Sequence, residues 1–375
     1  MAAKAKEFAL IADSVRRYYV DMGSFDKHSH HKLHFVNINA NESIAWARSG
    51  RVGGPAMVRV ANWMTHIHYE MQSPFHRPFI ERMGRHFELL RFDVRGNGLS
   101  TSSQFVHNLD TFTEELEVVT KAHGAQKFVI FGVGGGGAAA IAFAARHPHL
   151  VSHLILLGAY AQGVLRSGVS AHERELLAAQ AKVVELGWTH KSSFVQNMLT
   201  GQVLQEADSA LYAALNEQQK LACNGAVAAG LLKANADLCV QSYVGLVQAP
   251  TLVLHSIDDP LVPFERGQAL AASIPGARLE ILQSRNHVPV ATEPAFDRLC
   301  ECIVEFVMPH AIALNLSKTE RELCALVGQG FDNLQIAARL DLKEKSVRNK
   351  VSALYRTMGV EGRAQAIIKA RELAP

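Results

Sequence analysis

The sequence predicts an α/β domain followed by a small all-helical domain. Short apolar runs alternate with helical segments over most of the chain, and one stretch between two such runs is purely helical. The last part of the chain shows helical periodicity alone. With 375 residues, 48% of them apolar and 19% charged, the chain has the composition of an ordinary folded protein.

Six apolar runs are candidate strands, at residues 57–63, 87–94, 127–133, 153–158, 251–255 and 278–282. Helical segments such as residues 112–123 and 136–147 separate them. Strands separated by helices favour a mostly parallel sheet that is covered on both faces. The purely helical stretch, about residues 161–249, predicts a cap over the carboxyl edge of that sheet, where ligands bind in open α/β folds.

The same patterns predict where the parts of the chain begin and end. We expect an N-terminal extension at residues 1–34, the α/β domain at residues 35–308, a linker at residues 309–315 and the helical domain at residues 316–375.

Several classes of protein are disfavoured. No run approaches the roughly 20 apolar residues that span a membrane, and residues 1–19 do not resemble a signal peptide. The five cysteines lack metal-site spacing and indicate reduced thiols, so we expect a cytoplasmic protein without membrane contact. The run Gly134–Gly137 lacks the Gly-Lys-Ser/Thr of a phosphate loop, and no dinucleotide fingerprint opens the first βα unit, so no cofactor is expected.

Histidines gather in two places, His28, His30, His31 and His34 near the N-terminus and His66 with His68 further on. No acidic or cysteine partner completes either group, so no metal is expected. The N-terminal group is predicted to lie on a solvated loop. The pair is predicted to share one side of an extended segment.

Positive charge is concentrated at the C-terminus. Residues 315–375 hold 11 Lys/Arg and 7 Asp/Glu, a net charge of +4, whereas the whole chain carries +3. The remaining residues therefore sum to −1. A small basic module joined to a near-neutral one indicates that only the tail meets a polyanion.

Four helices are predicted in that tail. Capping boxes at Ser317–Glu320 and Asp332–Gln335 open the first two helices, and Gly330 separates them. The third helix, about residues 343–356, buries Val347, Val351 and Leu354 and exposes Lys345, Arg348, Asn349 and Ser352 on the other side. A helix of this kind suits the major groove of double-stranded DNA. The fourth helix spans residues 363–373.

Residues 316–366 resemble the LuxR/GerE family of helix-turn-helix regulators almost end to end. The resemblance implies that Lys345, Ser346, Arg348, Asn349 and Lys350 face DNA. It also implies a homodimer formed through the fourth helix. Lys343 stands where the family usually has a capping serine or threonine, which weakens the start of the recognition helix by ~1 kcal/mol.

Four motifs of the large domain resemble the α/β-hydrolase superfamily, over about residues 35–308. Residues 93–100 (DVRGNGLS) match the loop after the family's fourth strand, and residues 128–132 (FVIFG) lead into its nucleophile turn. Residues 255–263 (HSIDDPLVP) match the acid loop, and residues 284–287 (SRNH) match the histidine loop. The resemblance implies an α/β-hydrolase fold with a helical cap.

The nucleophile is missing from this pattern. The family turn reads G-x-S-x-G, but residues 132–136 read GVGGG, so Gly134 stands in the place of the serine. Glycine has no side chain and cannot form an acyl-enzyme. The resemblance implies that Asp259, or less favourably Asp258, orients His287. Base and acid are thus predicted to remain without a nucleophile.

Three functions fit this remnant. The favoured one is a transcription regulator that senses a mostly apolar small molecule with an ester, lactone, carbonyl or hydroxyl group. His287 and N–H groups at Gly135 and near Trp63 or Met64 would hold it, and Gly134 would widen the pocket floor. The second is a serine-independent enzyme that uses the His–Asp dyad. The third is a purely structural domain. A natural serine at position 134 that had been replaced by glycine on purpose would give the same sequence.

Overall fold

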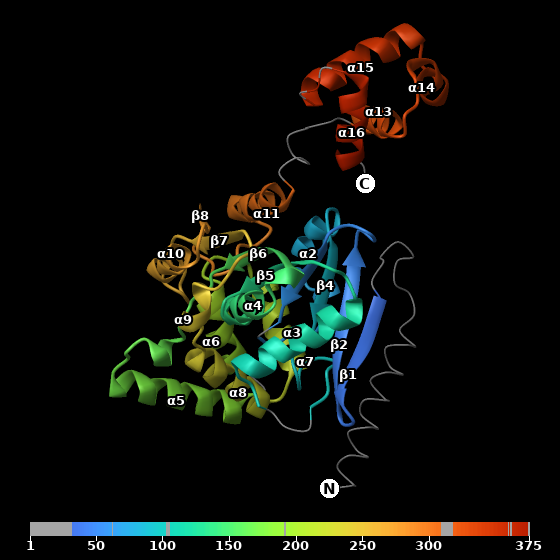
Figure 1. The fold of residues 1–375 in the computed structure, drawn as a ribbon. Helices are drawn as coiled ribbons and strands as arrows, with labels where there is room; N and C mark the ends of the chain where they lie inside the picture. The colour runs from blue at the N-terminus through green and yellow to red at the C-terminus, as the bar shows by residue number, and fades with distance from the viewer. Residues whose placement is uncertain are drawn as a thin grey trace, which may run out of the picture. The chain divides into compact units, whose positions relative to one another are not determined.

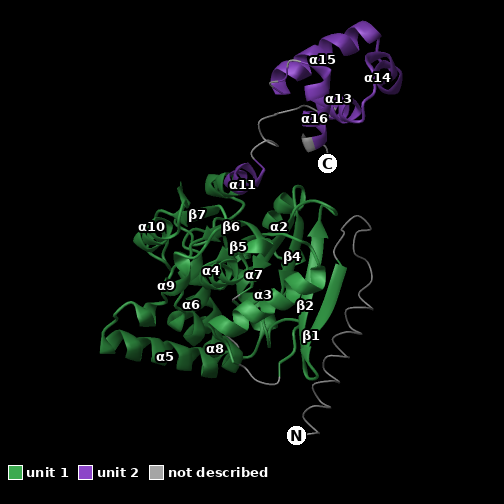
Figure 2. Ribbon diagram, viewed as in Figure 1, with its two compact units in different colours: residues 1–300 green, residues 301–375 purple. Residues whose placement is uncertain are grey.

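The computed structural model describes residues 32–61, 63–102, 106–190, 193–308, 318–358, 360 and 362–373. It forms two compact units, residues 1–300 and residues 301–375, which are coloured separately in Figure 2. The division falls within helix α11 (Pro294–Val307). The predicted linker, the predicted extension up to residue 31 and the capping residue Ser317 lie outside the described residues.

The first unit is built on a sheet in the order β1-β2-β4-β3-β5-β6-β7-β8 (Figure 1). The strands are β1 (Lys32–Asn39), β2 (Glu42–Gly50), β3 (Ala56–Val60), β4 (Glu88–Phe92), β5 (Phe128–Val133), β6 (Val151–Leu157), β7 (Thr251–Ser256) and β8 (Arg278–Leu282). Neighbours from β4 to β8 pair in parallel, whereas β1 and β2 pair antiparallel at one edge. The predicted mostly parallel sheet is confirmed, and all six predicted strands are present with slightly different ends.

The hairpin β1–β2 was not predicted. In β1, His34 stacks on Trp46 of β2, with 4.3 Å between ring centroids. The expectation of a solvated loop is therefore wrong for His34, because the aromatic partner comes from the next strand. His28, His30 and His31 lie outside the described residues.

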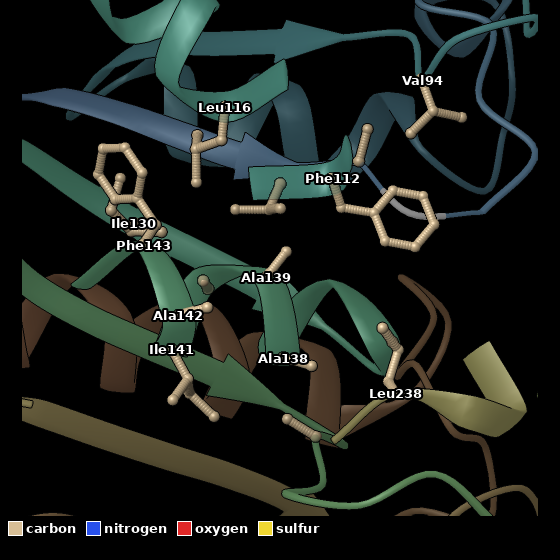
Figure 3. Close-up of a cluster of buried hydrophobic side chains, with 14 of the residues drawn as sticks. Val94, Phe112, Leu116, Ile130, Ala138, Ala139, Ile141, Ala142, Phe143 and Leu238 are labelled. Atoms are coloured by element: carbon tan, nitrogen blue, oxygen red, sulfur yellow. The ribbon is translucent and has the colours of Figure 1, made fainter. Parts of the chain in front are cut away.

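Helices cover both faces of the central strands. On one face, α3 (Leu109–His123) packs beside α4 (Gly135–Arg146), with Phe112 and Leu116 next to the alanines of α4 (Figure 3). The small side chains of α4 let this helix lie close to the sheet. On the other face, Phe79 of α2 (Arg77–Gly84) stacks on Phe131 of β5, with centroids 5.1 Å apart.

The predicted cap lies between β6 and β7. It consists of η3 (Val164–Arg166), α5 (Ala171–Gly187), α6 (Phe194–Val203), α7 (Ser209–Ala222), α8 (Gly225–Asp237) and α9 (Gln241–Val244). Side chains cap the starts of three of these helices: Ser170 for α5, Asp208 for α7 and Asn224 for α8. The remaining elements of the unit are η1 (Tyr69–Met71), η2 (Pro148–Leu150) and α10 (Phe264–Ser273).

The second unit is a helical domain with its own core. It contains α13 (Lys318–Gly328), α14 (Asn333–Leu340), α15 (Glu344–Met358) and α16 (Arg363–Leu373). Val347, Val351 and Leu354 of α15 are buried in that core, as predicted. The predicted capping box at Asp332 and Gln335 is also present. Among the described helices of the chain, none combines the length and hydropathy needed to cross a bilayer.

Candidate functional site

The turn between β5 and α4 places Gly134 at the carboxyl edge of the sheet. Its φ of +53° and ψ of −124° are rarely adopted by residues with a side chain. A Cβ atom on Gly134 would lie 3.2 Å from Nε2 of His287. Glycine is also required at Gly132, where a Cβ atom would come within 2.7 Å of the carbonyl oxygen of Gly136. The turn is therefore tight, and it faces His287.

Asp259 orients His287 through the ring nitrogen that faces away from Gly134. Nδ1 of His287 lies 2.7 Å from Oδ2 of Asp259, and both residues are buried. The other carboxylate oxygen, Oδ1, accepts hydrogen bonds from the N–H groups of Leu261 and Val262. Burial opposes ionisation of Asp259, but the bond with His287 and these N–H groups lower its pKa below the usual value. Asp258 is exposed, so Asp259 is the residue that meets His287.

Two further residues shape this pair, and neither was recognised in the sequence. Gly158 follows β6 with a φ of +56°, and a Cβ atom there would lie 2.5 Å from Cε1 of His287. A glycine at this position thus leaves room for the imidazole. His255 of β7 places its Nε2 2.8 Å from the carbonyl oxygen of Val262 and 3.4 Å from Oδ2 of Asp259. Asp259 consequently lies between two imidazoles.

A cavity of about 470 Å³ opens above Gly134 and beneath the cap. Trp63, Met64, Gly134, Gly135 and His287 all line it, so the structure brings the predicted ligand-binding residues together. Gly135 opens α4, and the first N–H groups of a helix have no acceptor within it. Such groups can receive an electronegative atom of a ligand.

The cap and the core meet at this cavity through polar side chains. Nε2 of Gln218, on α7, donates to the carbonyl oxygen of Met64 at 3.3 Å. Gln219, the next residue, donates to Oγ1 of Thr200 at 2.7 Å. Both glutamines line the cavity, and neither Oε1 atom has a hydrogen-bond partner among the described residues. Each of these two lining residues thus holds a buried oxygen that is unsatisfied among the described residues.

Several polar residues of the cavity were missed in the sequence, among them Arg59, His76, Tyr160 and Arg266. Arg59 lies within the apolar strand β3, and His76 immediately precedes α2. Tyr160 donates to the carbonyl oxygen of Asn235 in the cap, and Arg266 to that of Gln162. No local pattern joins these positions, since their elements meet only in the folded domain.

The histidines His66 and His68 are buried in an irregular turn before η1, so the expectation of an extended segment is wrong. Burial lowers the pKa of His66 to about 4, which keeps its ring neutral near pH 7. Within the part of the chain that the structure describes, no group of three or more His, Cys, Asp or Glu side chains is arranged to hold a metal ion.

The second unit presents a polar face on α15. The residues predicted to face DNA are all exposed there: Lys345, Ser346, Arg348, Asn349, Lys350 and Ser352. Arg348 bonds Glu344 one turn earlier, at 2.9 Å. The carbonyl oxygen of Lys343 accepts the first hydrogen bonds of the helix, from the N–H groups of Ser346 and Val347. The lysine side chain has no oxygen to cap this end.

Comparisons with known proteins agree with this division. Residues 73–289 match the family described as serine aminopeptidase, S33, and residues 314–370 match bacterial regulatory proteins of the luxR family. A hydrolase from Pseudomonas aeruginosa PA01 superposes with a TM-score of 0.61 at 21% identity, over 74% of this chain and 98% of its own. That likeness concerns the fold.

Two curated relatives represent the regulatory side. The probable transcriptional regulatory protein SgaR of Hyphomicrobium methylovorum is 26% identical over 205 residues, which are 54% of this chain and 77% of SgaR. The DNA-binding transcriptional activator DevR/DosR of Mycobacterium tuberculosis is 47% identical over 58 residues, 16% of this chain and 27% of the activator. The chain therefore belongs to the α/β-hydrolase family described as serine aminopeptidase, S33, and ends in a domain of the luxR family of bacterial regulatory proteins.

Proposed function

We propose that this chain is a transcription regulator whose hydrolase-fold domain senses a small molecule without hydrolysing it. A DNA-binding regulator follows from the joining of a hydrolase-fold domain to a luxR-family domain, and the similarity to SgaR agrees with it. The sensing role and the loss of hydrolysis are the new parts of the proposal.

The relation of Gly134 to His287 carries this proposal. The imidazole is oriented by Asp259 as in a Ser-His-Asp triad, and Nε2 faces the position where a side chain on residue 134 would begin. Residue 134 has no hydroxyl group, so the oxygen that would attack an ester and carry the acyl group is missing. The cavity, the N–H groups of α4 and His287 remain able to bind a polar group.

Binding can be transmitted because the ligand would lie between the cap and the core. Gln218 connects α7 to Met64, and Tyr69 donates to the carbonyl oxygen of Ala214 on the same helix at 3.4 Å. A ligand that changes these contacts favours one arrangement of the cap over another. It can shift that equilibrium only by the difference between its affinities for the two arrangements.

The test starts from the purified full chain. Small molecules that it retains are released by denaturation and identified by mass spectrometry, and a duplex that it binds is selected from a random library. We expect the recovered compound to raise the melting temperature and to change the affinity for the duplex. If no duplex were selected from the library, the assignment as a DNA-binding regulator would be wrong. A compound that binds and leaves DNA affinity unchanged would contradict sensing.

A homodimer is part of the proposal. Proteins with a helix-turn-helix commonly bind paired half-sites as dimers. Ile368 of α16 is 62% exposed, which leaves an apolar side chain available for a second copy. Analytical ultracentrifugation of the protein with its duplex should show two chains for each duplex, and Ile368→Glu should weaken that assembly. A single chain on the duplex would contradict the dimer.

The intact dyad also favours a second candidate, an enzyme that needs no serine. His287 bonded to Asp259 at 2.7 Å can take a proton from water or from a substrate. Turnover of esters or lactones by the unmodified protein that disappears in His287→Ala would establish this enzyme and exclude the inert sensor.

A further inference from the structure

We propose that the cavity binds a small organic carboxylate, and that Arg59 and His76 receive its carboxylate group. This inference rests on the proposed sensing function and specifies the chemical class of the ligand. It replaces the mostly apolar molecule with an ester, lactone, carbonyl or hydroxyl group that the sequence led us to expect.

The charges of the cavity wall are one-sided. Two arginines line it, Arg59 and Arg266, and no aspartate or glutamate is among its described lining residues. Arg266 also takes part in no described ion pair. A low-dielectric wall with fixed cations favours a ligand that brings its own negative charge.

The carboxylate of Glu70 forms ion pairs with two guanidinium groups, those of Arg59 and Arg91. Nη1 of Arg59 lies 2.9 Å from Oε1 of Glu70, and Nη1 of Arg91 lies 2.6 Å from its Oε2. The side chains of Glu70 and Arg91 are each 1% exposed, whereas that of Arg59 is 19% exposed. Arg59 and Arg91 thus share the carboxylate of Glu70. Arg59, which is the more exposed of the two arginines, is the one that lines the cavity.

Asp93 is a further buried carboxylate, and its oxygens are bonded to backbone groups. Oδ1 of Asp93 accepts the N–H group of Ile67, and Oδ2 accepts that of Leu99, each at 2.9 Å. Burial raises the pKa of Asp93 to about 7, so at neutral pH only part of its population is charged. Asp93 thus has backbone partners of its own, and Glu70 is the carboxylate that pairs with both Arg59 and Arg91.

His76 lies next to Arg59 and also lines the cavity. Nδ1 of His76 lies 3.4 Å from Nη2 of Arg59. A guanidinium can only donate, so Nδ1 is the acceptor. Burial, followed by the charge of Arg59, lowers the pKa of His76 to about 3, so the ring is neutral and its one proton is on Nε2. This buried Nε2 has no hydrogen-bond partner among the described residues.

The apolar side chains of the cavity favour a ligand with an apolar part attached to its carboxylate. Phe75, Val203 and Leu215 line the cavity and belong to one apolar cluster. A guanidinium and an N–H group beside such a wall suit an acid with an alkyl or aryl tail. The volume of about 470 Å³ leaves room for a tail of medium length.

The test compares acids with their own methyl esters on the full chain. Calorimetric titration uses the straight-chain acids from butanoate to decanoate and phenylacetate, each beside its methyl ester. We expect one or more acids to bind at least about tenfold more tightly than their esters, because the ester lacks the charge that Arg59 requires. Arg59→Gln should remove this preference, and Arg174→Gln, on the exposed surface of α5, should keep it.

His76→Gln is a second variant, and it leaves the ion pairs of Glu70 in place. It should lower the affinity for the acids several-fold and leave the affinity for the esters unchanged. Esters that bind as tightly as acids would overturn the carboxylate assignment and leave the sensing function standing. If neither series binds, although other compounds recovered from the protein do, the carboxylate assignment alone fails. If no compound binds at all, both proposals fail.

Discussion

His287 directs its Nε2 at Gly134, and a Cβ atom on that glycine would lie only 3.2 Å away. The imidazole is fixed from the opposite side by Asp259, at 2.7 Å. The arrangement of a catalytic triad is thus preserved up to the atom that would begin the nucleophile. A domain in this state can bind the polar end of a ligand and lacks the group that would attack it.

Gly134→Ser is expected to create esterase activity. The turn joins a strand to a helix and has the positive φ of a strained position, and the new hydroxyl would be next to Nε2 of His287. Hydrolysis of p-nitrophenyl acetate should rise by at least about 10², and it should show a burst of one nitrophenol for each chain. The double variant with His287→Ala should lose the gain.

Gly134→Ala is the matched control, because it adds the same Cβ atom without a hydroxyl group. It should be as inactive as the parent protein. Equal activity of the serine and alanine variants would mean that the hydroxyl does not act as a nucleophile, and the triad interpretation of this site would then be wrong.

Charge changes on α15 are expected to change DNA affinity in opposite directions. Arg348→Ala and Lys345→Ala each remove an exposed cation and should weaken binding by about 1–3 kcal/mol. Glu344→Gln removes the carboxylate that pairs with Arg348 and should tighten binding. Fluorescence anisotropy at several salt concentrations measures both effects, with a shallower salt slope in the two alanine variants. An unchanged affinity in both alanine variants would exclude this face.

The start of α15 should respond to a better capping residue. Lys343→Ser supplies an oxygen that can accept an N–H group of the first turn, and a serine cap stabilises a helix by about 1 kcal/mol. Hydrogen exchange of the full chain should therefore slow in the peptides of α15. Lys343→Ala removes the same charge without adding an acceptor. If alanine protected the helix as much as serine, capping would not be the cause.

Acid should destabilise the hydrolase-fold unit well above pH 4, through its buried histidines. His76 has a pKa of about 3 in the folded protein and about 6.5 when unfolded, so the unfolded chain binds the proton first. Its contribution to the free energy of unfolding is present above pH 6.5 and decreases as the pH falls below it. Asp259 has a lowered pKa, so its contribution decreases only below about pH 4.

Urea unfolding of the full chain at pH 7.5 and pH 5 separates these groups. The midpoint should be lower at pH 5, and His76→Gln should reduce the difference between the two conditions. A difference that is the same in the variant would show that His76 does not titrate in this way.

The residues of the central site could be located from the sequence, because each of them lies in a short motif. Gly134, Asp259 and His287 each stand at a family position that is read from a few neighbouring residues. Their meeting follows from parallel strands that end at one edge of the sheet. The helical tail was predictable for a similar reason, since Val347, Val351 and Leu354 repeat along a single helix.

The parts that escaped prediction depend on partners far away in the sequence. Arg59 lies in the apolar run AMVRV, and only the folded domain places Glu70, Arg91 and His76 around it. The strand β2 lacks a regular alternation of apolar and polar residues, because most of its side chains are buried on both faces. His34 looked solvated because its partner Trp46 belongs to that unrecognised strand.

We propose that a ligand in the hydrolase-fold cavity controls DNA binding by the C-terminal domain. The most direct measurement is the affinity of the full chain for its selected duplex, by fluorescence anisotropy, with and without the compound that the protein retains. We expect a change in affinity of at least about fivefold, which corresponds to about 1 kcal/mol of coupling, without any consumption of the compound. An affinity that is identical with and without the bound compound, or hydrolysis of the compound during the titration, would contradict it.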